Sequence, residues 1–245
     1  MLTVYHLYPE LLNLYGDRGN VLAFTQRCRW RGMDVRLEEV SLGDSIDFSR
    51  ADFLFIGGGS DREQSILARD MASIGEHLRA AMEDGLVVLA VCGGYQMLGT
   101  FYQNTEGRKI PGLGIMDFYT EAGEGRLIGN VAVKIDGAGE PVVTGFENHG
   151  GRTHLGDVKP LARVIAGHGN NGIDGTEGAR WKNVFCTYLH GPVLPRNPWL
   201  TDHLISLALE RQGKSGTLEP LSDQLEARGR DRILRRLKVP VTPTR

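Results

Sequence analysis

A single cysteine stands where an apolar segment meets two glycines. The run Leu86–Val91 contains only apolar residues, and Cys92 follows it directly, ahead of Gly93 and Gly94. A nucleophile at a sharp turn from strand to helix needs small neighbours, because larger side chains would collide there. The positive end of the helix dipole also favours the thiolate form of a cysteine at this position. We therefore predict that Cys92 is a catalytic nucleophile; the alternative is a buried structural cysteine.

A second glycine cluster follows another apolar run. Gly57–Gly59 comes directly after Phe53–Ile56, so it lies at the carboxyl end of an expected strand. Ligands of open α/β sheets bind at that edge, where backbone N–H groups can stabilise a developing oxyanion. The N–H groups of Gly58, Gly59 and Gly93 are the candidates for this role. The alternative is a tight turn that binds nothing.

The general base must be a histidine or a carboxylate that reaches the sulfur. Of the seven histidines, His190 ends the apolar run Val184–Leu189 and precedes Gly191 and Pro192, which stop the strand at the same sheet edge. His149 lies in a glycine-rich stretch and is the second candidate. We predict His190 as the base, with His149 as the alternative.

The elements that would position these residues alternate between strand-like and helical patterns. The second expected helix begins near Asp61, after a capping box formed by Ser60 and Glu63. This alternation predicts βαβ units around a mostly parallel sheet. The expected strands are Thr3–Leu7, Val35–Val40, Phe53–Ile56 and Leu86–Val91, and the expected helices are Arg18–Arg31, about 22 residues from Asp61, and a segment after Cys92.

The pattern changes after Pro111 to short strands and glycine-rich turns, as in an insertion or an antiparallel edge. No linker separates the two halves, so we expect a single domain over residues 1–238 and a frayed tail over residues 239–245. The expected elements of this half are strands at Leu127–Ile135 and Val184–Leu189 and helices at Trp199–Gln212 and Asp223–Leu237.

Composition excludes several classes of protein. With 41% hydrophobic and 24% charged residues among 245, the chain has the composition of a globular protein, and its net charge of -2 argues against nucleic acid as a partner. No stretch approaches roughly 18 apolar residues, and no signal peptide is recognisable, so we expect no membrane insertion and a cytoplasmic location. Cys28, Cys92 and Cys186 are too scattered for a disulfide framework or a metal site.

Four motifs give the chain a family resemblance. The segment Ala90–Gln96 resembles the nucleophile signature of class I glutamine amidotransferases, in the branch that contains cobyric acid synthase and the GatD-type subunits of lipid II isoglutaminyl synthases. Gly145–Arg152 and Tyr188–Gly191 are also similar to that branch, and Asn13–Asn20 resembles the GatD type in particular. The resemblance implies a flavodoxin-like open sheet with helices on both faces.

The resemblance also implies roles for individual residues. Cys92 would be the nucleophile and His190 the base, with Gly58, Gly59 and Gly93 near the oxyanion. Arg126 would hold the carboxylate of the glutamine substrate, and Gln96 would also contact the substrate. Many class I amidotransferases orient the histidine with a glutamate two positions later, where this chain has Pro192. The third member of the triad would then be absent, replaced by another carboxylate such as Glu147, or contributed by a partner.

The same resemblance implies a partner that uses the ammonia. We expect a heterodimer with a MurT-like Mur ligase homologue that holds ATP and Mg²⁺ and amidates the D-glutamate α-carboxylate of lipid II to D-isoglutamine. We expect no cofactor in this chain, because Gly213-Lys214-Ser215 lacks the first glycine of a Walker motif at Ala208. The alternatives are a glutaminase for another acceptor, such as a cobyrinate-type carboxylate, and a non-catalytic binding module on the same fold.

Overall fold

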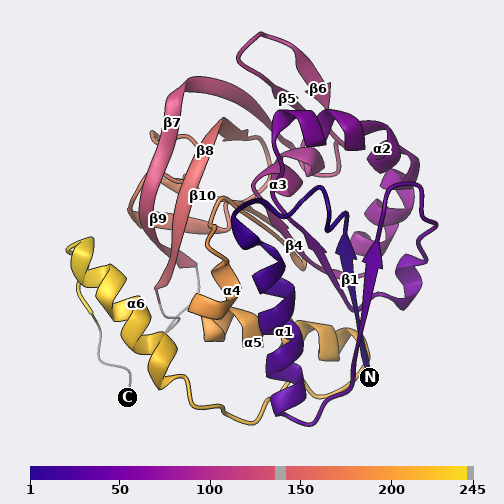
Figure 1. Cartoon of the computed structure of the whole chain (residues 1–245), viewed down its shortest axis with the longest axis vertical. Helices are drawn as coiled ribbons and strands as arrows, with labels where there is room; N and C mark the ends of the chain where they lie inside the picture. The colour runs from indigo at the N-terminus through magenta and orange to yellow at the C-terminus, as the bar shows by residue number, and fades with distance from the viewer. Residues whose placement is uncertain (136–141, 242–245) are drawn as a thin grey trace.

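The computed structural model describes residues 1–135 and 142–241 and is a mixed α/β structure (Figure 1). Its main sheet has the strand order β11-β12-β4-β3-β1-β2, in which every neighbouring pair is parallel except β11 with β12. Without its antiparallel edge, this is the flavodoxin-like order. The predicted fold class is therefore confirmed. The strands are β1 (Leu2–Leu7), β2 (Val35–Val40), β3 (Phe53–Ile56), β4 (Val87–Val91), β11 (Ala179–Trp181) and β12 (Val184–Thr187).

Helices cover both faces of this sheet. Phe53 of β3 stacks on Phe24 of α1, with ring centroids 4.1 Å apart. Ile56 points to the opposite face, because side chains alternate along a strand, and there it lies against Gly94 of α3. The central strands β3 and β4 are buried along their whole length, as expected for a parallel sheet covered on both sides. The helices are α1 (Arg18–Trp30), α2 (Asp61–Glu83), α3 (Gly93–Leu98), α4 (Val193–Arg196), α5 (Pro198–Arg211) and α6 (Gln224–Arg236).

The start of α2 follows the local sequence signal. Ser60 and Glu63 form the predicted capping box, in which each side chain binds the other residue's backbone N–H. Asp61 and Glu63 add negative charge to the first turn, where it is favourable. Within the described residues there are also two 3₁₀ turns, Leu14–Gly16 and Phe48–Arg50.

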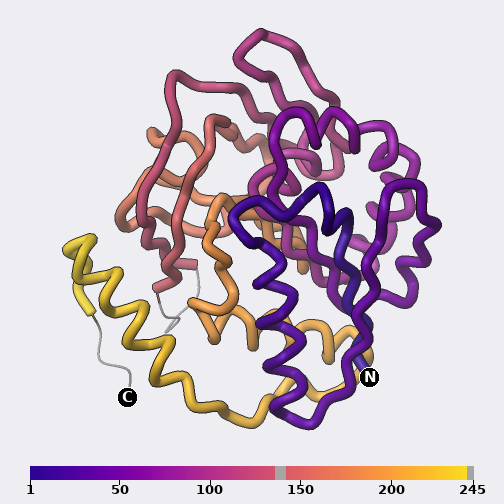
Figure 2. Tube along the Cα trace, viewed as in Figure 1, coloured from indigo at the N-terminus to yellow at the C-terminus, as the bar shows by residue number. Residues whose placement is uncertain are grey.

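A second sheet lies beside the first and carries the middle of the chain (Figure 2). Its order is β10-β9-β7-β5-β6, with β8 paired to β7. We predicted short strands here, and that is wrong for β7 and β8, which pair over most of their length with a register shift between Ala122 and Leu127. The strands are β5 (Phe101–Gln103), β6 (Lys109–Pro111), β7 (Phe118–Ile135), β8 (Val143–Leu155), β9 (Ala162–Ala166) and β10 (Thr176–Glu177).

A network of ion pairs ties α1 to the C-terminal part of the chain. Arg27 is 5% exposed and binds Asp202 of α5 through two nitrogens, at 2.7 and 2.6 Å. It also binds Asp223, the residue before α6, at 2.7 Å, and Arg31 binds Asp202 as well, at 2.7 Å. Planar guanidinium groups suit such paired contacts. The C-terminal end of α1 is therefore anchored to α5 and to the residue before α6.

The remaining expectations concern the termini and membrane insertion. Within residues 1–135 and 142–241, no helix is long and apolar enough to cross a membrane. Part of the predicted frayed tail, 242–245, lies outside the described residues. Val239 is buried beside Ala132 of β7 and Leu234 of α6. The expectation of one domain over 1–238 stays a prediction.

Candidate active site

Cys92 lies at an elbow between β4 and α3. Its backbone angles, φ 50 and ψ -106, are strained for a residue with a side chain. The neighbouring glycines are needed for space: a Cβ on Gly93 would lie 2.8 Å from the nitrogen of Gly59, and one on Gly94 would lie 2.7 Å from the oxygen of Ile56. Cys92 remains 7% exposed, while Cys186 is fully buried. The elbow geometry that the sequence predicted at Cys92 is present.

The glycine loop after β3 lies beside the cysteine. Parallel pairing aligns Ile56 of β3 with Ala90 of β4, so Gly57–Gly59 and Cys92 leave the sheet at one edge. A Cβ on Gly58 would lie 3.3 Å from Cys92 Cβ and 3.1 Å from the His190 ring. The Gly58 N–H, however, donates to Asp17 at 2.8 Å. The N–H groups of Gly59 and Gly93 remain as predicted oxyanion donors, and these two residues lie close together.

His190 lies just beyond the end of β12, the strand that neighbours β4 on its other side. The residue is completely buried, and its backbone pairs with Phe146 of β8 through hydrogen bonds of 2.7 and 3.2 Å. Burial lowers the pKa of the imidazole, but the charge of Cys92, the hydrogen bond to Asp17 and the charge of Asp17 outweigh burial and raise the pKa to about 10. Because the His190 ring and Cys92 Cβ both border Gly58, the two side chains are close enough to act as a nucleophile and base pair.

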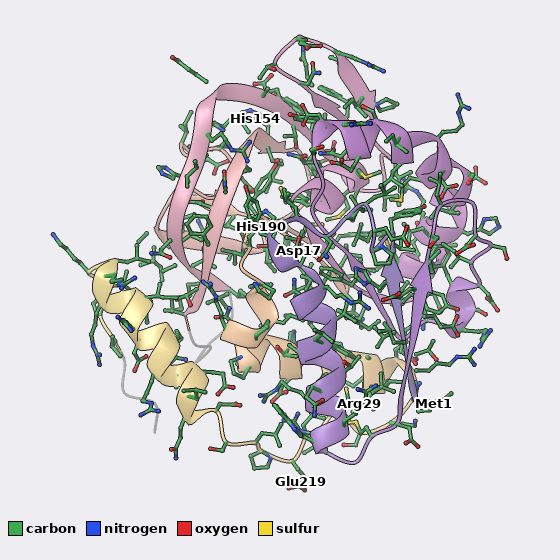
Figure 3. All side chains as sticks on the ribbon, viewed as in Figure 1. Met1, Asp17, Arg29, His154, His190 and Glu219 are labelled. Atoms are coloured by element: carbon green, nitrogen blue, oxygen red, sulfur yellow. The ribbon has the colours of Figure 1, made fainter. Side chains whose placement is uncertain are left out.

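Asp17 faces the other side of the imidazole, and the sequence analysis did not single it out. Its Oδ1 lies 3.4 Å from His190 Nδ1, and both side chains are completely buried. Figure 3 shows the two side by side near the centre of the molecule. Asp17 precedes α1 and lies within the Asn13–Asn20 motif, which was the one sequence signal for it. The carboxylate missing at Pro192 therefore has a counterpart within this chain.

The two other candidates for the base and the third member have different environments. The carboxylate of Glu147 accepts the N–H groups of His168 and Gly169, at 2.8 and 2.9 Å. His149 stacks on Tyr188 at 3.8 Å, and its Nδ1 contacts the Gly151 oxygen at 2.8 Å. Burial lowers the pKa of His149 to about 4. The Glu147 carboxylate is therefore occupied by the backbone at 168–169. The His149 ring is occupied by its contacts with Tyr188 and Gly151.

Arg126, predicted to bind the substrate carboxylate, is exposed on β7 and oriented by one residue. Its Nε and Nη2 donate to the side-chain and backbone oxygens of Asn148, both at 2.7 Å. The Asn148 amide in turn donates to the Tyr15 hydroxyl at 2.5 Å. Tyr15 has a left-handed φ of 57 and packs edge-on against His190, with ring centroids 4.9 Å apart. These contacts link Arg126, through Asn148, to Tyr15, whose ring packs against the His190 imidazole.

Gln96 is nearly buried, and both ends of its amide have protein partners. Gln64 donates to Oε1 at 2.9 Å, and Nε2 donates to the Tyr188 hydroxyl at 3.1 Å. Contact of Gln96 with substrate stays a prediction. Across the parts of the chain that are described, no group of three or more His, Cys, Asp or Glu residues is arranged to hold a metal ion.

Residues 3–198 match the family model described as the CobB/CobQ-like glutamine amidotransferase domain. This range contains Cys92, His190, Asp17 and Arg126.

Two curated relatives are similar over most of the chain. The GatD subunit of lipid II isoglutaminyl synthase (glutamine-hydrolyzing) from Staphylococcus aureus is 46% identical over 86% of this chain and 86% of its own. Its counterpart from Streptococcus pneumoniae is 42% identical over 86% and 82%. A probable cobyric acid synthase from Methanothermobacter thermautotrophicus is 33% identical over 79% of this chain but only 40% of its own length.

Solved structures with low sequence identity share the fold. The glutaminase domain of Trypanosoma brucei CTPS superposes with a TM-score of 0.56 at 12% identity, over 90% of this chain and 97% of that domain. A glutamine amidotransferase from Thermotoga maritima gives 0.53 at 13% identity, over 97% and 93%. Together with the match to the family model, these findings show that the chain belongs to the CobB/CobQ-like glutamine amidotransferase family.

Proposed function

We propose that this chain is the glutaminase subunit of a lipid II isoglutaminyl synthase. The observation that carries the proposal is the meeting of Cys92, His190 and Asp17 around Gly58, at one edge of the main sheet. A nucleophile, a base and a carboxylate that orients the base are the parts needed for acyl transfer. High identity to GatD subunits over most of the chain supports the particular pathway.

The reaction begins with attack of the Cys92 thiolate on the side-chain carbonyl of L-glutamine. The C–S bond forms as the carbonyl π electrons move onto oxygen, and the Gly59 and Gly93 N–H groups donate to this oxyanion. The Gly58 N–H has another role, because it holds the Asp17 carboxylate in place. Asp17 then orients the imidazole so that Nε2 faces the reaction.

Collapse of the tetrahedral intermediate releases ammonia. The C–N bond breaks as His190 donates its proton to the leaving nitrogen, and a γ-glutamyl thioester remains on Cys92. The neutral imidazole next takes a proton from water, which attacks the thioester carbonyl. The C–S bond breaks, glutamate leaves, and the thiolate and imidazolium are restored.

Substrate recognition depends on the far side of the site. Arg126 has donors beyond those that bind Asn148 and can pair with the α-carboxylate of glutamine. Gln64 and Tyr188 hold both ends of the Gln96 amide on α3. We assign Gln96 to fixing the helix that follows Cys92, alongside its predicted contact with substrate.

The ammonia needs an acceptor that this chain does not activate. We propose a heterodimer with a MurT-like Mur ligase homologue, which would hold ATP and Mg²⁺ and amidate the D-glutamate α-carboxylate of lipid II. The complex would work in the cytoplasm, where the three free cysteines stay reduced. A cobyrinate-type acceptor is less well supported, because the similarity spans only 40% of the cobyric acid synthase.

Activity of the reconstituted complex tests the proposal. The chain, co-purified with its Mur ligase homologue, should release glutamate from glutamine and amidate lipid II in the presence of ATP and Mg²⁺. The Cys92→Ala complex should lose glutamate release by about a thousandfold or more, yet still amidate lipid II when ammonium salt is supplied. Full glutaminase activity in Cys92→Ala, or activity with a corrinoid synthetase alone, would overturn the assignment.

A further inference from the structure

The backbone between β12 and His190 no longer has neighbouring strands on both sides. β12 ends at Thr187, and Tyr188 and Leu189 lead to the imidazole. All these residues are buried, at 2% exposure or less. A buried N–H group without an acceptor destabilises the structure, so the acceptors of these N–H groups determine what holds His190 in place.

One side chain accounts for this short segment. The Tyr188 N–H donates to Oε1 of Glu177 at 2.7 Å. The Thr187 hydroxyl donates to the same oxygen at 2.9 Å and accepts the Leu189 N–H at 3.0 Å. The next N–H, that of His190, donates to Phe146 at 2.7 Å. Oε1 of Glu177 therefore binds the Tyr188 N–H directly and supports the Leu189 N–H through Thr187, and β8 accepts the N–H of His190.

Glu177 is completely buried and is held from a different sheet. It lies on β10. The Asn170 side chain holds the next residue, Gly178: it donates to the Gly178 oxygen and accepts the Gly178 N–H, both at 2.9 Å. Asn170 Oδ1 also accepts the Tyr95 hydroxyl of α3 at 3.2 Å. Asn170 therefore supports both the strand that carries Glu177 and α3, the helix after Cys92.

The segment that Glu177 holds reaches the nucleophile helix as well. The Tyr188 hydroxyl binds Gln96 of α3 and, at 2.7 Å, Thr153 of β8. A displacement of Tyr188 would therefore move both the approach to His190 and the support under Gln96.

We propose that Glu177 is a positioning residue for the glutaminase reaction, because its Oε1 fixes the segment that places His190 against Cys92. The inference rests on the proposed function. Glu177 touches neither the sulfur nor the imidazole and acts through the backbone of Tyr188 and through Thr187.

Only one oxygen of Glu177 has this role. Its Oε2 has no hydrogen-bond partner among the described residues. Burial, together with the charge of Glu147, raises the pKa of Glu177 to about 7. A proton on Oε2 leaves Oε1 free to accept both hydrogen bonds, and an amide in its place keeps the same acceptor.

The first experiment compares two variants of similar size in the complex with the ligase. Glu177→Gln keeps the acceptor and should retain kcat within about threefold of wild type. Glu177→Leu removes it and should lower kcat by about tenfold or more, with the KM for glutamine changed less than about threefold, because misplacing the base impairs chemistry more than binding. Equal kcat values in the two folded variants would overturn the proposal.

A second pair covers the case in which Glu177→Leu fails to fold. Thr187→Ser keeps the bridging hydroxyl, whereas Thr187→Val removes it and leaves the Leu189 N–H without an acceptor. The valine variant should lose kcat by about tenfold and the serine variant by less than about threefold. Thr25→Val is the matched control, because it also removes a buried hydroxyl, one that donates to the Leu22 oxygen within α1. Wild-type kcat in a folded Thr187→Val would contradict the inference.

Alkylation of Cys92 gives a readout that does not depend on glutamine hydrolysis. The rate of iodoacetamide labelling at pH 7, assigned to Cys92 by mass spectrometry, reports how well His190 supports the thiolate. Labelling of Glu177→Leu or Thr187→Val should be about tenfold slower than in wild type, and Glu177→Gln should match wild type. If wild type labels at Cys92 but releases no glutamate with any partner, the proposed function fails while labelling still decides the role of Glu177. Equal labelling rates in all variants would refute that role.

Discussion

Asp17 Oδ1 and His190 Nδ1 lie 3.4 Å apart, although the residues are 173 positions apart in the chain. The other oxygen of Asp17 accepts the Gly58 N–H, so the carboxylate is held in one orientation. A carboxylate at Nδ1 keeps the proton on that nitrogen and leaves Nε2 facing the sulfur. The Asp17 carboxyl group therefore joins the Gly57–Gly59 loop, the base His190 and the segment before α1.

Asp17→Asn should lower kcat for glutamine hydrolysis by about a hundredfold or more, because the amide no longer stabilises the imidazolium. The charge of Asp17 helps to raise the pKa of His190, so its removal should lower that pKa. Steady-state assays of the complex across pH measure both effects. Asp52→Asn is the control, because Asp52 is also buried but binds the Thr3 N–H of β1. Unchanged kcat in Asp17→Asn would mean that the third member comes from elsewhere.

Gly93→Ala should reduce kcat by about tenfold or more, because its Cβ would lie 2.8 Å from Gly59 N and 2.9 Å from Gly59 O. Both groups are backbone atoms, so relief of the clash must displace a proposed oxyanion donor. Gly129→Ala on β7 is the matched control, since its Cβ would meet no atom within 4 Å. The test is a comparison of kcat and melting temperature for the two variants. Equal behaviour of the pair would remove the argument for an oxyanion site between the two loops.

Arg126→Lys should raise the KM for glutamine by about tenfold and leave kcat within about threefold, because an ammonium cannot reproduce the paired contacts of a guanidinium. Glutamate release over a range of glutamine concentrations separates the two constants. Arg50→Lys provides the comparison, because Arg50 is an exposed arginine that binds Glu38 at 3.4 Å. A fall in kcat at constant KM would instead place Arg126 in the chemical step.

His6 should make the protein sensitive to acid. Burial, with a contribution from Arg18, lowers its pKa from 6.5 to about 4, and neither ring nitrogen has a partner among the described residues. The depressed pKa means that the contribution to stability is complete above pH 6.5 and is lost as pH falls through 4, by up to about 3 kcal/mol.

Urea unfolding at pH 7 and at pH 4.5 tests this expectation. The free energy of unfolding should fall less between these pH values in His6→Phe than in wild type. Burial gives His149 a lowered pKa as well, so part of the acid sensitivity should remain. His77→Gln, at an exposed position of α2, should behave as wild type. The same decrease in His6→Phe as in wild type would refute the role of His6.

Local sequence signals were sufficient for part of the site. Cys92, His190 and the Gly57–Gly59 loop each follow an apolar run, and parallel strands end at a common edge, so their proximity could be predicted. Asp17 gave no such signal, because it follows a 3₁₀ turn, Leu14–Gly16, and not a strand. Its role depends on where that turn folds back over the sheet, which only the tertiary structure reveals.

The second sheet was harder to predict for a related reason. Gly123, Gly125 and Gly129 within β7, and the glycines of Gly145–Arg152 within β8, indicate turns when the sequence is considered alone. In the fold they allow close approach: a Cβ on Gly151 would lie 2.6 Å from Gln96 Nε2. Glu177, with no motif around it, could not have been selected from the sequence.

The ion pairs of Arg27 bear on how this protein could be shortened. Residues 202 and 223 both lie beyond the stretch that matches the family model, yet they anchor the helix that begins next to Asp17. A truncated version ending at position 198 would keep each side chain that we assign to the chemistry. It would also leave a buried guanidinium without its counter-charges, so we expect such a fragment to lose the alignment of the carboxyl group with the imidazole.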